Sequence, residues 1–218
     1  MESIQVKELS CGYGRKQVIE HISFQVSEGS CVAILGDNGS GKSTLLQVLA
    51  GIKKPDSGEI DFYGKKAGKQ DFRARVGFVP QEPVLVENCS VIDNLRLWYQ
   101  DRQELEKSLE QGFLKAFGVA QMTGLSCKKL SGGMKKKVSI ACAIAGEPAI
   151  LILDEPCAAL DLDSKKQLRV FLHSYVQQGH TVLLATHEEA DFAICTQMMK
   201  IEKGKCMQYE WKRDVEKI

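Results

Sequence analysis

Apolar residues recur with two different periods along the chain, and each period predicts its own kind of element. Alternation of apolar and polar positions over residues 4–6 and 18–26 predicts half-buried strands near the N-terminus. Residues 31–35 are continuously apolar, as expected for a parallel strand that is covered on both faces. Further strands are predicted over residues 59–63, 76–79, 150–153 and 181–185, with a closing hairpin around Gly204.

A helical period replaces the strand pattern in the middle of the chain. Leu105, Leu109, Phe113 and Phe117 recur at intervals of four within a stretch from about residue 91 to 117. Shorter helices are expected over residues 43–50, 164–178 and 188–195. Because strands alternate with helices on both sides of the helical stretch, we expect a mostly parallel sheet with a helical lobe inserted into it.

The length of the chain, 218 residues, fits one compact unit better than two independent domains. We predict a single domain over residues 1–218, in which residues 1–83 and 145–218 form the core and residues 84–144 form the inserted helical lobe. No apolar run approaches the roughly 20 residues that span a bilayer. If the protein works at a membrane, another chain must cross it.

Charge and cysteine usage narrow the cellular setting. A net charge of +1 supplies no overall field that would attract nucleic acid, so no nucleic-acid partner is expected. The eight cysteines include no C-x-x-C pair, and the N-terminus shows no secretion signal. Both observations favour reduced thiols in a cytosolic protein.

Residues 36–43 match the phosphate-binding pattern G-x-x-x-x-G-K-[ST] at every fixed position, with an apolar strand before them and a helix after them. Glycines allow successive N–H groups to point at one anion, and the helix N-terminus adds about half a positive charge. Lys42 is expected to reach the β- and γ-phosphates of a nucleotide, and the hydroxyl of Ser43 to ligate Mg²⁺.

Two later segments carry further candidate chemistry. An apolar strand delivers Asp154 and Glu155 to its end, where Asp154 could support Mg²⁺ and Glu155 could polarise an attacking water. Leu130-Ser131-Gly132-Gly133 opens a helix whose N-terminus could bind a second phosphate. Each segment alone has an ordinary explanation, a loop start for the acidic pair and a plain helix cap for the tetrapeptide.

The three segments together, in this order, resemble the ABC ATPase family from Tyr13 to His187. The resemblance implies an α/β fold: a P-loop NTPase core with a mostly parallel sheet, an N-terminal antiparallel β subdomain and an inserted helical subdomain. It also implies ATP and Mg²⁺ as cofactors. The residues it implies for ATP are Tyr13, Gly36, Asn38, Gly39, Ser40, Gly41, Lys42, Ser43, Thr44 and Gln81, joined in trans by Ser131, Gly132 and Gly133 of a second cassette.

The resemblance also implies a role for each remaining residue. Lys42, Glu155 and His187 are then catalytic, and Ser43, Gln81 and Asp154 hold Mg²⁺. In the family pattern Tyr13 stacks on adenine, Gln81 links the sheet to the helical lobe, and His187 contacts the γ-phosphate. Residues 159–161 match the loop that lies across the seam of the cassette dimer.

The sequence departs from the family pattern at Met134, at residues 135–137, where the family often places glutamine and arginine, and at Cys157. Met134 follows the L-S-G-G tetrapeptide where the family usually has glutamine, and Lys135, Lys136 and Lys137 come directly after it. The methionine lacks an amide, so we expect altered contact with the partner's nucleotide rather than loss of activity. Cys157 stands where threonine is common and is expected to be tolerated.

We therefore expect the ATP-binding and ATP-hydrolysing subunit of an ABC transporter, peripheral on the cytoplasmic face of a membrane. It would pair with a second cassette, as a homodimer or a heterodimer, and drive membrane-spanning subunits. A soluble ABC ATPase with a role such as cluster assembly is the alternative, whereas a switch or kinase would give no reason for residues 131–133 or His187. The short stretch between Gly58 and Gln81, and a chain that ends at Ile218 without a further regulatory domain, favour export.

Overall fold

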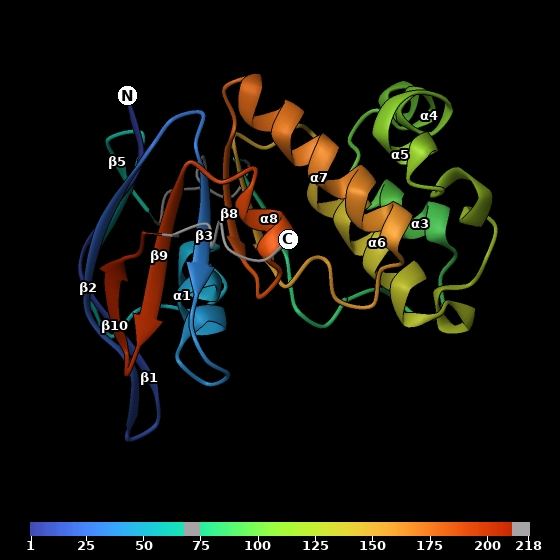
Figure 1. The fold of residues 1–218 in the computed structure, drawn as a ribbon. Coiled ribbons are helices and arrows are strands. Elements are labelled where there is room, and N and C mark those ends of the chain that lie inside the picture. Colours follow the sequence, from blue (N-terminus) through green and yellow to red (C-terminus); the bar gives the residue numbers. More distant parts are fainter. Residues whose placement is uncertain (68–74, 211–218) are drawn as a thin grey trace, which may run out of the picture.

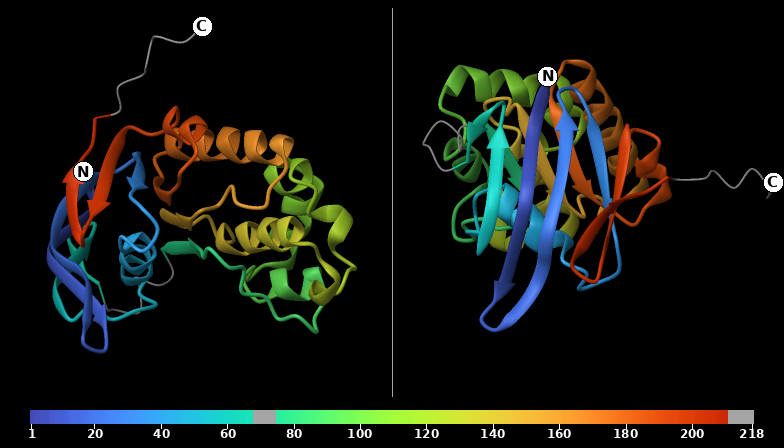
Figure 2. Two further views of the ribbon diagram at one scale, coloured as in Figure 1. Left: turned by 60° about the horizontal axis from the view of Figure 1, so that its bottom comes forward. Right: turned by 90° about the vertical axis from the view of Figure 1, so that its left-hand side faces the viewer.

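A six-stranded sheet runs through the centre of the molecule, with an antiparallel sheet and one helix on one face and most helices on the other (Figures 1 and 2). The computed structural model describes residues 1–67 and 75–210. The central sheet contains, in spatial order, β10 (Lys205–Gln208), β9 (Gln197–Glu202), β3 (Cys31–Leu35), β8 (Thr181–Ala185), β7 (Ile150–Asp154) and β6 (Val76–Val79). All neighbours pair in parallel except β10 with β9, which form the expected hairpin.

The N-terminal sheet is antiparallel throughout. It contains, in spatial order, β2 (Lys16–Ser27), β1 (Glu2–Tyr13), β4 (Ser57–Phe62) and β5 (Lys65–Lys66). The expected fold class, a mostly parallel α/β core with an N-terminal antiparallel sheet and inserted helices, is confirmed.

Most of the described helices come after β6 along the chain. The helices are α1 (Lys42–Leu49), α3 (Val91–Arg96), α4 (Arg102–Glu110), α5 (Gly112–Ala116), α6 (Gly132–Ala143), α7 (Leu162–Gln177) and α8 (Glu189–Phe192), with 3₁₀ turns at Ala120–Met122 and Cys127–Lys129. Helices α3 to α6 gather on the right in Figure 1, away from the N-terminal sheet. The division of the chain after residues 83 and 144 stays a prediction.

The helical stretch expected over residues 91–117 is broken into three helices. Asp101 caps α4 by accepting a hydrogen bond from the Gln103 N–H, which begins a new helix after α3. Gly112 then has φ +69°, a conformation that interrupts a helix and favours glycine, so α5 starts afresh. The four-residue apolar repeat survives the break, because the Phe113 ring stacks on Phe117 and on Phe171 of α7.

Alternating side chains of the central sheet divide the core in two. In β7, Ile150 and Ile152 face α1 and the N-terminal sheet, whereas Leu151 and Leu153 face the helices. All four are fully buried. Each such side chain contributes about 1.5–3 kcal/mol by leaving water, so the sheet is held firmly from both sides and its strand ends form a rigid edge.

That edge positions the residues with candidate chemistry. Because β3, β6, β7 and β8 are parallel, the segments that follow them emerge side by side at one edge of the sheet. The segment after β3 begins at Gly36, and those after β6, β7 and β8 contain Gln81, Glu155 and His187. Open parallel sheets bind ligands at this edge.

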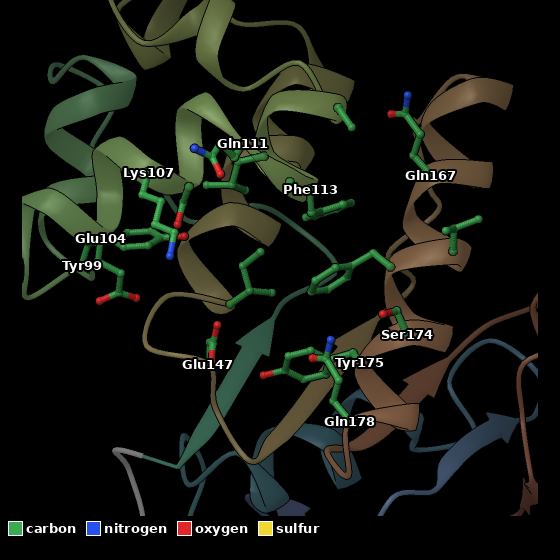
Figure 3. Close-up of a pocket in the computed structure, with 17 residues that line it drawn as sticks. Tyr99, Glu104, Lys107, Gln111, Phe113, Glu147, Gln167, Ser174, Tyr175 and Gln178 are labelled. Atoms are coloured by element: carbon green, nitrogen blue, oxygen red, sulfur yellow. The ribbon is translucent and has the colours of Figure 1, made fainter.

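A separate cleft of about 830 Å³ lies between helices α4 and α5 and helix α7 (Figure 3). Phe113, Phe171 and Tyr175 line it together with polar side chains such as Glu104 and Gln167. None of the candidate site residues contributes to its lining. In the described part of the chain, no helix is both long and apolar enough to cross a membrane.

Candidate functional site

The glycines of the loop after β3 occupy conformations that suit them alone. Gly36, Gly39 and Gly41 have φ values of +146°, +78° and +110°. A Cβ at Gly36 would lie 2.3 Å from the Ile201 carbonyl oxygen, and one at Gly41 would lie 2.7 Å from Cγ2 of Ile19. Neighbouring strands therefore pack closely against one side of the loop. The Ser40 N–H donates to the Asp37 carbonyl within the loop, and a glycine-rich loop at a helix N-terminus is the kind of segment whose N–H groups bind an anion.

The Lys42 ammonium and the Ser40 hydroxyl are the buried polar side-chain groups of this loop. The Lys42 side chain is 5% exposed, and its Nζ donates to the carbonyl oxygens of Gly36 (2.6 Å) and Asp37 (3.1 Å). The Ser40 hydroxyl is buried and finds no hydrogen-bond partner among residues 1–67 and 75–210. Buried polar groups are rarely left unpaired, so a loop with this inventory fits a phosphate. Thr44 is buried on α1, whereas Asn38 and Gly39 are exposed at the tip of the loop.

Asp154 supplies a buried carboxylate next to the start of α1. It is 2% exposed, and its Oδ1 has no hydrogen-bond partner. Burial raises the pKa of Asp154, and a hydrogen bond with Ser43 opposes that rise. An uncompensated carboxylate beside a hydroxyl is what a hard cation requires, and Mg²⁺ prefers such oxygen ligands. Asp154 and Ser43 therefore fit Mg²⁺.

Glu155 joins the two neighbouring strand ends. Its Oε2 accepts a hydrogen bond from Nε2 of Gln81 at 3.3 Å, and its Oε1 lies 3.6 Å from Nε2 of His187. The residue has φ +47°, and its backbone N–H donates to the Ala185 carbonyl of β8. A glutamate held in this sparsely populated conformation by a neighbouring strand has a directed side chain. The structure thus brings Gln81, Glu155 and His187 together.

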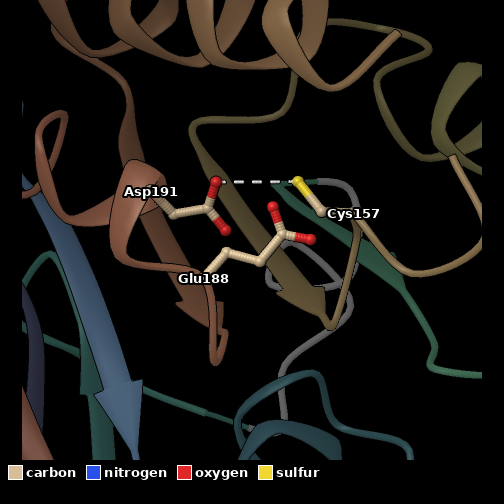
Figure 4. A group of neighbouring side chains, drawn as sticks. All are labelled: Cys157, Glu188 and Asp191. Carbon is tan, nitrogen blue, oxygen red and sulfur yellow. Dashed lines mark hydrogen bonds between the residues drawn. The ribbon is translucent and has the colours of Figure 1, made fainter. Parts of the chain in front are cut away.

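An ion-pair cluster holds the turn that carries His187. Cys157, Glu188 and Asp191 lie close enough to suggest a metal site (Figure 4). However, Arg169 donates to both carboxylates at 2.6 Å, and Lys165 donates to Glu188 at 2.5 Å. With the carboxylates already paired with cations, the cluster is explained as a structural network.

The same network shows why a cysteine is accommodated at position 157. Burial raises the pKa of the Cys157 thiol to about 12, so it stays protonated and donates to Asp191 Oδ1 at 3.6 Å. Asp191 also accepts from the Thr186 hydroxyl, one residue before His187. A thiol therefore makes the donor contact that a threonine hydroxyl would make.

Tyr13 lies at the end of β1 and is 53% exposed, and its hydroxyl donates to Oε1 of Gln47 in α1 at 3.4 Å. Lys53 Nζ lies 4.0 Å from the centre of its ring, a cation–π contact. Asp56 fixes the turn by accepting from the Gly12 N–H at 2.8 Å. An exposed ring with a cation at one face can stack an adenine, but no hydrogen bond links Tyr13 to residues 36–44 in the described chain.

Residues 131–133 form the N-terminus of α6. The Ser131 hydroxyl caps the helix by accepting from the Met134 N–H at 3.3 Å. Gly133 packs against the loop after β7, where an added Cβ would lie 2.5 Å from the Ala159 carbonyl oxygen. Among the described residues, no hydrogen bond or ion pair joins residues 131–133 to the glycine loop of the same chain.

One buried residue near the site was not singled out from the sequence. Lys136 is 2% exposed and donates to the backbone carbonyls of Pro80 and Gln81. Helical spacing could have revealed it, because Ser139 and Ile140, three and four residues later, are buried on the same face of α6. The run of three lysines does not by itself indicate which of them is buried.

Comparison with known proteins agrees with these features. A family described as "ABC transporter" matches residues 19–158. The sulfate/thiosulfate import ATP-binding protein of Synechococcus elongatus is 35% identical over 94% of the chain and 61% of the relative. The Nod factor export ATP-binding protein I of Paraburkholderia xenovorans is 35% identical over 93% of the chain and 69% of the relative. The chain thus spans less than two thirds of the cyanobacterial relative's length.

A solved structure agrees in fold along almost the whole chain. The dimeric structure of a bacterial ABC transporter cassette superposes with a TM-score of 0.82 at 25% identity. The match covers 93% of this chain and 95% of that one.

Proposed function

The chain belongs to the ABC transporter family as one of its ATPase cassettes, and on that premise we propose that it is the motor subunit of a membrane transporter. In this proposal it lies on the cytoplasmic face of the membrane. It binds ATP with Mg²⁺, pairs with a second cassette, and drives membrane-spanning subunits as the dimer closes and reopens.

The observation that carries the proposal is the meeting of four strand ends at one site. The glycine loop after β3, Gln81 after β6, Glu155 after β7 and His187 after β8 converge at one edge of the sheet. Glu155 contacts both Gln81 and His187. A phosphate loop alone would serve any nucleotide-binding protein. A carboxylate held by both an amide and an imidazole is instead an arrangement for activating water beside a phosphate.

Each residue then has one proposed task. The loop N–H groups and Lys42 hold the β- and γ-phosphates, and Ser43, Asp154 and Gln81 hold Mg²⁺, which when bound neutralises charge on the phosphates. Glu155 orients and deprotonates the attacking water. His187, whose side chain is half exposed, contacts the γ-phosphate from the neighbouring strand. Tyr13 stacks on the adenine.

A second cassette completes the site. A triphosphate carries several negative charges, and one loop leaves its outer face open to solvent. The capped N-terminus of α6 at residues 131–133 is exposed or half-exposed and makes no hydrogen bond with its own glycine loop in the described chain. Facing a partner's γ-phosphate, it would favour closure while that phosphate is attached. The dimeric form of the similar solved cassette supports this pairing.

We predict that Met134→Gln leaves ATP turnover equal or raises it. Met134 is partly buried against the helical core, and its backbone N–H donates to the Ser131 hydroxyl that caps α6. The substitution adds an amide near the partner's nucleotide without disturbing that cap. The measurement is kcat of the purified chain; a clear loss of turnover would show that the methionine makes a contact the pairing scheme lacks.

The membrane subunits are proposed to dock on exposed apolar residues beside Gln81. Val84 is 81% exposed, and Leu97 and Trp98 at the end of α3 are 67% and 61% exposed. Asn94 ties the two segments together by bonding both backbone groups of Val86. Large exposed apolar side chains on segments tied together in this way suit an interaction surface, and a docked segment there would sense movement of the loop at Gln81.

We predict that Trp98→Ser uncouples the cassette from its membrane subunits. Interface tryptophans commonly contribute about 2 kcal/mol or more, so co-purification and transport should fall while the ATPase rate of the isolated chain persists. Val170→Ser on α7 is the control, because Val170 is an exposed apolar residue (71%, against 61% for Trp98) outside the proposed docking surface. If the wild-type chain binds none of the membrane proteins encoded by neighbouring genes, the alternative of a soluble ABC ATPase, with a role such as cluster assembly, is favoured instead.

We propose that the transporter exports its substrate, because the sequence between Gly58 and Gln81 is short. Relatives named for import and for export match the chain at the same 35% identity, so the comparison favours neither direction. Transport into sealed inside-out vesicles that contain the membrane subunits would decide the direction.

A further inference from the structure

Lys136 is a buried cation whose direct hydrogen-bond partners are backbone carbonyls rather than a carboxylate. Its side chain lies within α6 at 2% exposure, and it forms no ion pair within residues 1–67 and 75–210. Its neighbours Lys135 and Lys137 do form ion pairs, with Glu87 and Asp161. Burial lowers the pKa of Lys136, and the charges of Asp154, Glu82 and Glu155 oppose that effect. Lys136 therefore lies in the field of the site's carboxylates, whereas Lys135 and Lys137 are only partly buried and pair with Glu87 and Asp161.

Its hydrogen bonds go to the backbone of one loop. Nζ donates to the carbonyl oxygens of Gln81 at 2.6 Å and Pro80 at 3.1 Å, across 55 and 56 residues of sequence. The side chain of the same Gln81 donates to Glu155 at 3.3 Å. A continuous path of contacts thus runs from α6, through Lys136 and Gln81, to the carboxylate proposed to activate water.

Stability alone gives little reason for a lysine here. Burying an ammonium costs several kcal/mol unless it is well paired, and an unbranched apolar side chain of similar length would occupy the same space. Two backbone carbonyls repay part of that cost through charge-assisted hydrogen bonds. What the lysine adds, and a methionine could not, is a fixed position for the backbone at Gln81.

We propose that Lys136 is a positioning residue that anchors the Gln81 backbone to helix α6, and so sets the Gln81 amide against Glu155. The inference rests on the proposed function, because it assigns Lys136 a part in the same hydrolysis site. Since α6 begins at Ser131, the anchor also ties the surface that meets the partner's nucleotide to the chain's own catalytic carboxylate.

The test compares Lys136→Met with Lys135→Met. The first removes the two donors and keeps the volume, and the second removes a surface ion pair one residue away. We expect Lys136→Met to lower kcat roughly tenfold, because misplacement of a reacting group by about 1 Å can cost that much or more. The affinity for ADP, measured by calorimetry, should be unchanged because the phosphate loop is untouched. Lys135→Met should retain the parent kcat.

A double-mutant cycle separates positioning from a structural role. If Lys136 acts through Gln81, Lys136→Met should lower kcat far less in a Gln81→Ala background than in the parent, whereas a general structural defect would add to that of Gln81→Ala. Lys136→Arg, which keeps a cation and its donors, should recover part of the lost kcat. Full additivity, or an unchanged kcat in Lys136→Met, overturns the proposal. A parent chain with no ATPase activity would instead overturn the proposed function, so the two failures are distinguishable.

Discussion

Glu155→Gln should nearly abolish ATP turnover while leaving ATP binding intact, and should trap the cassette as a nucleotide-dependent dimer. The amide keeps the size of the side chain and can still contact Gln81 and His187. It cannot accept a proton from the attacking water, and loss of a general base typically costs about 10²–10⁴-fold. Because the γ-phosphate is no longer cleaved, the closed state that it stabilises should persist.

The measurements are the steady-state ATPase rate and the mass in solution with and without ATP. Glu189→Gln is the matched control, since Glu189 is an exposed glutamate just beyond the His187 turn. That variant should keep the parent rate and the parent mass change. An unimpaired rate in Glu155→Gln would remove Glu155 from its proposed role.

Lys42→Ala should weaken ATP binding roughly 10- to 100-fold, because hydrogen bonds to charged groups contribute about 1.5–3 kcal/mol. Lys42 also donates to the carbonyls of Gly36 and Asp37, so its removal loosens the loop as well. Calorimetric titration with ADP, together with the melting temperature, separates lost binding from lost folding. Unchanged nucleotide affinity would contradict the phosphate-loop assignment.

Lys42→Ala, mixed with a second variant, Gly132→Asp, tests whether each ATP site is shared between two chains. Gly132→Asp places a carboxylate at the start of α6, where the helix tolerates it and the partner's phosphate does not. An added Cβ there meets only the Ala159 Cβ, at an ordinary 3.8 Å. Each variant alone should be nearly inactive. Mixed, they should regain activity, because the intact loop of one chain then meets the intact α6 of the other.

Gly132→Ala is the control for the added side chain and should stay active on its own. If the mixture of Lys42→Ala and Gly132→Asp shows no activity beyond the sum of its parts, the head-to-tail pairing is wrong. If Gly132→Asp alone hydrolyses ATP at the parent rate, residues 131–133 do not meet the nucleotide.

Local patterns in the sequence determined most of the fold and the contents of the candidate site. Three predicted strands, residues 31–35, 76–79 and 181–185, match β3, β6 and β8 at both ends. This success has a simple cause, since a strand covered on both faces must be apolar throughout. The glycine loop could be predicted because its chemistry lies in consecutive residues. The parallel order of the strands then brings the later segments to the same edge of the sheet.

Tertiary packing decided what periodicity and motif could not. The break at Gly112 depends on a single backbone conformation, and the pairing of Cys157, Arg169 and Asp191 joins residues from three separate segments. Lys136 is the clearest case. Three consecutive lysines look alike in the sequence, but helix α6 turns only the middle one inward, toward the carbonyls of Pro80 and Gln81. The sequence by itself determined which groups are available for phosphate chemistry. The packing of α6 against β6 decided which of the three lysines contacts the loop that carries Gln81.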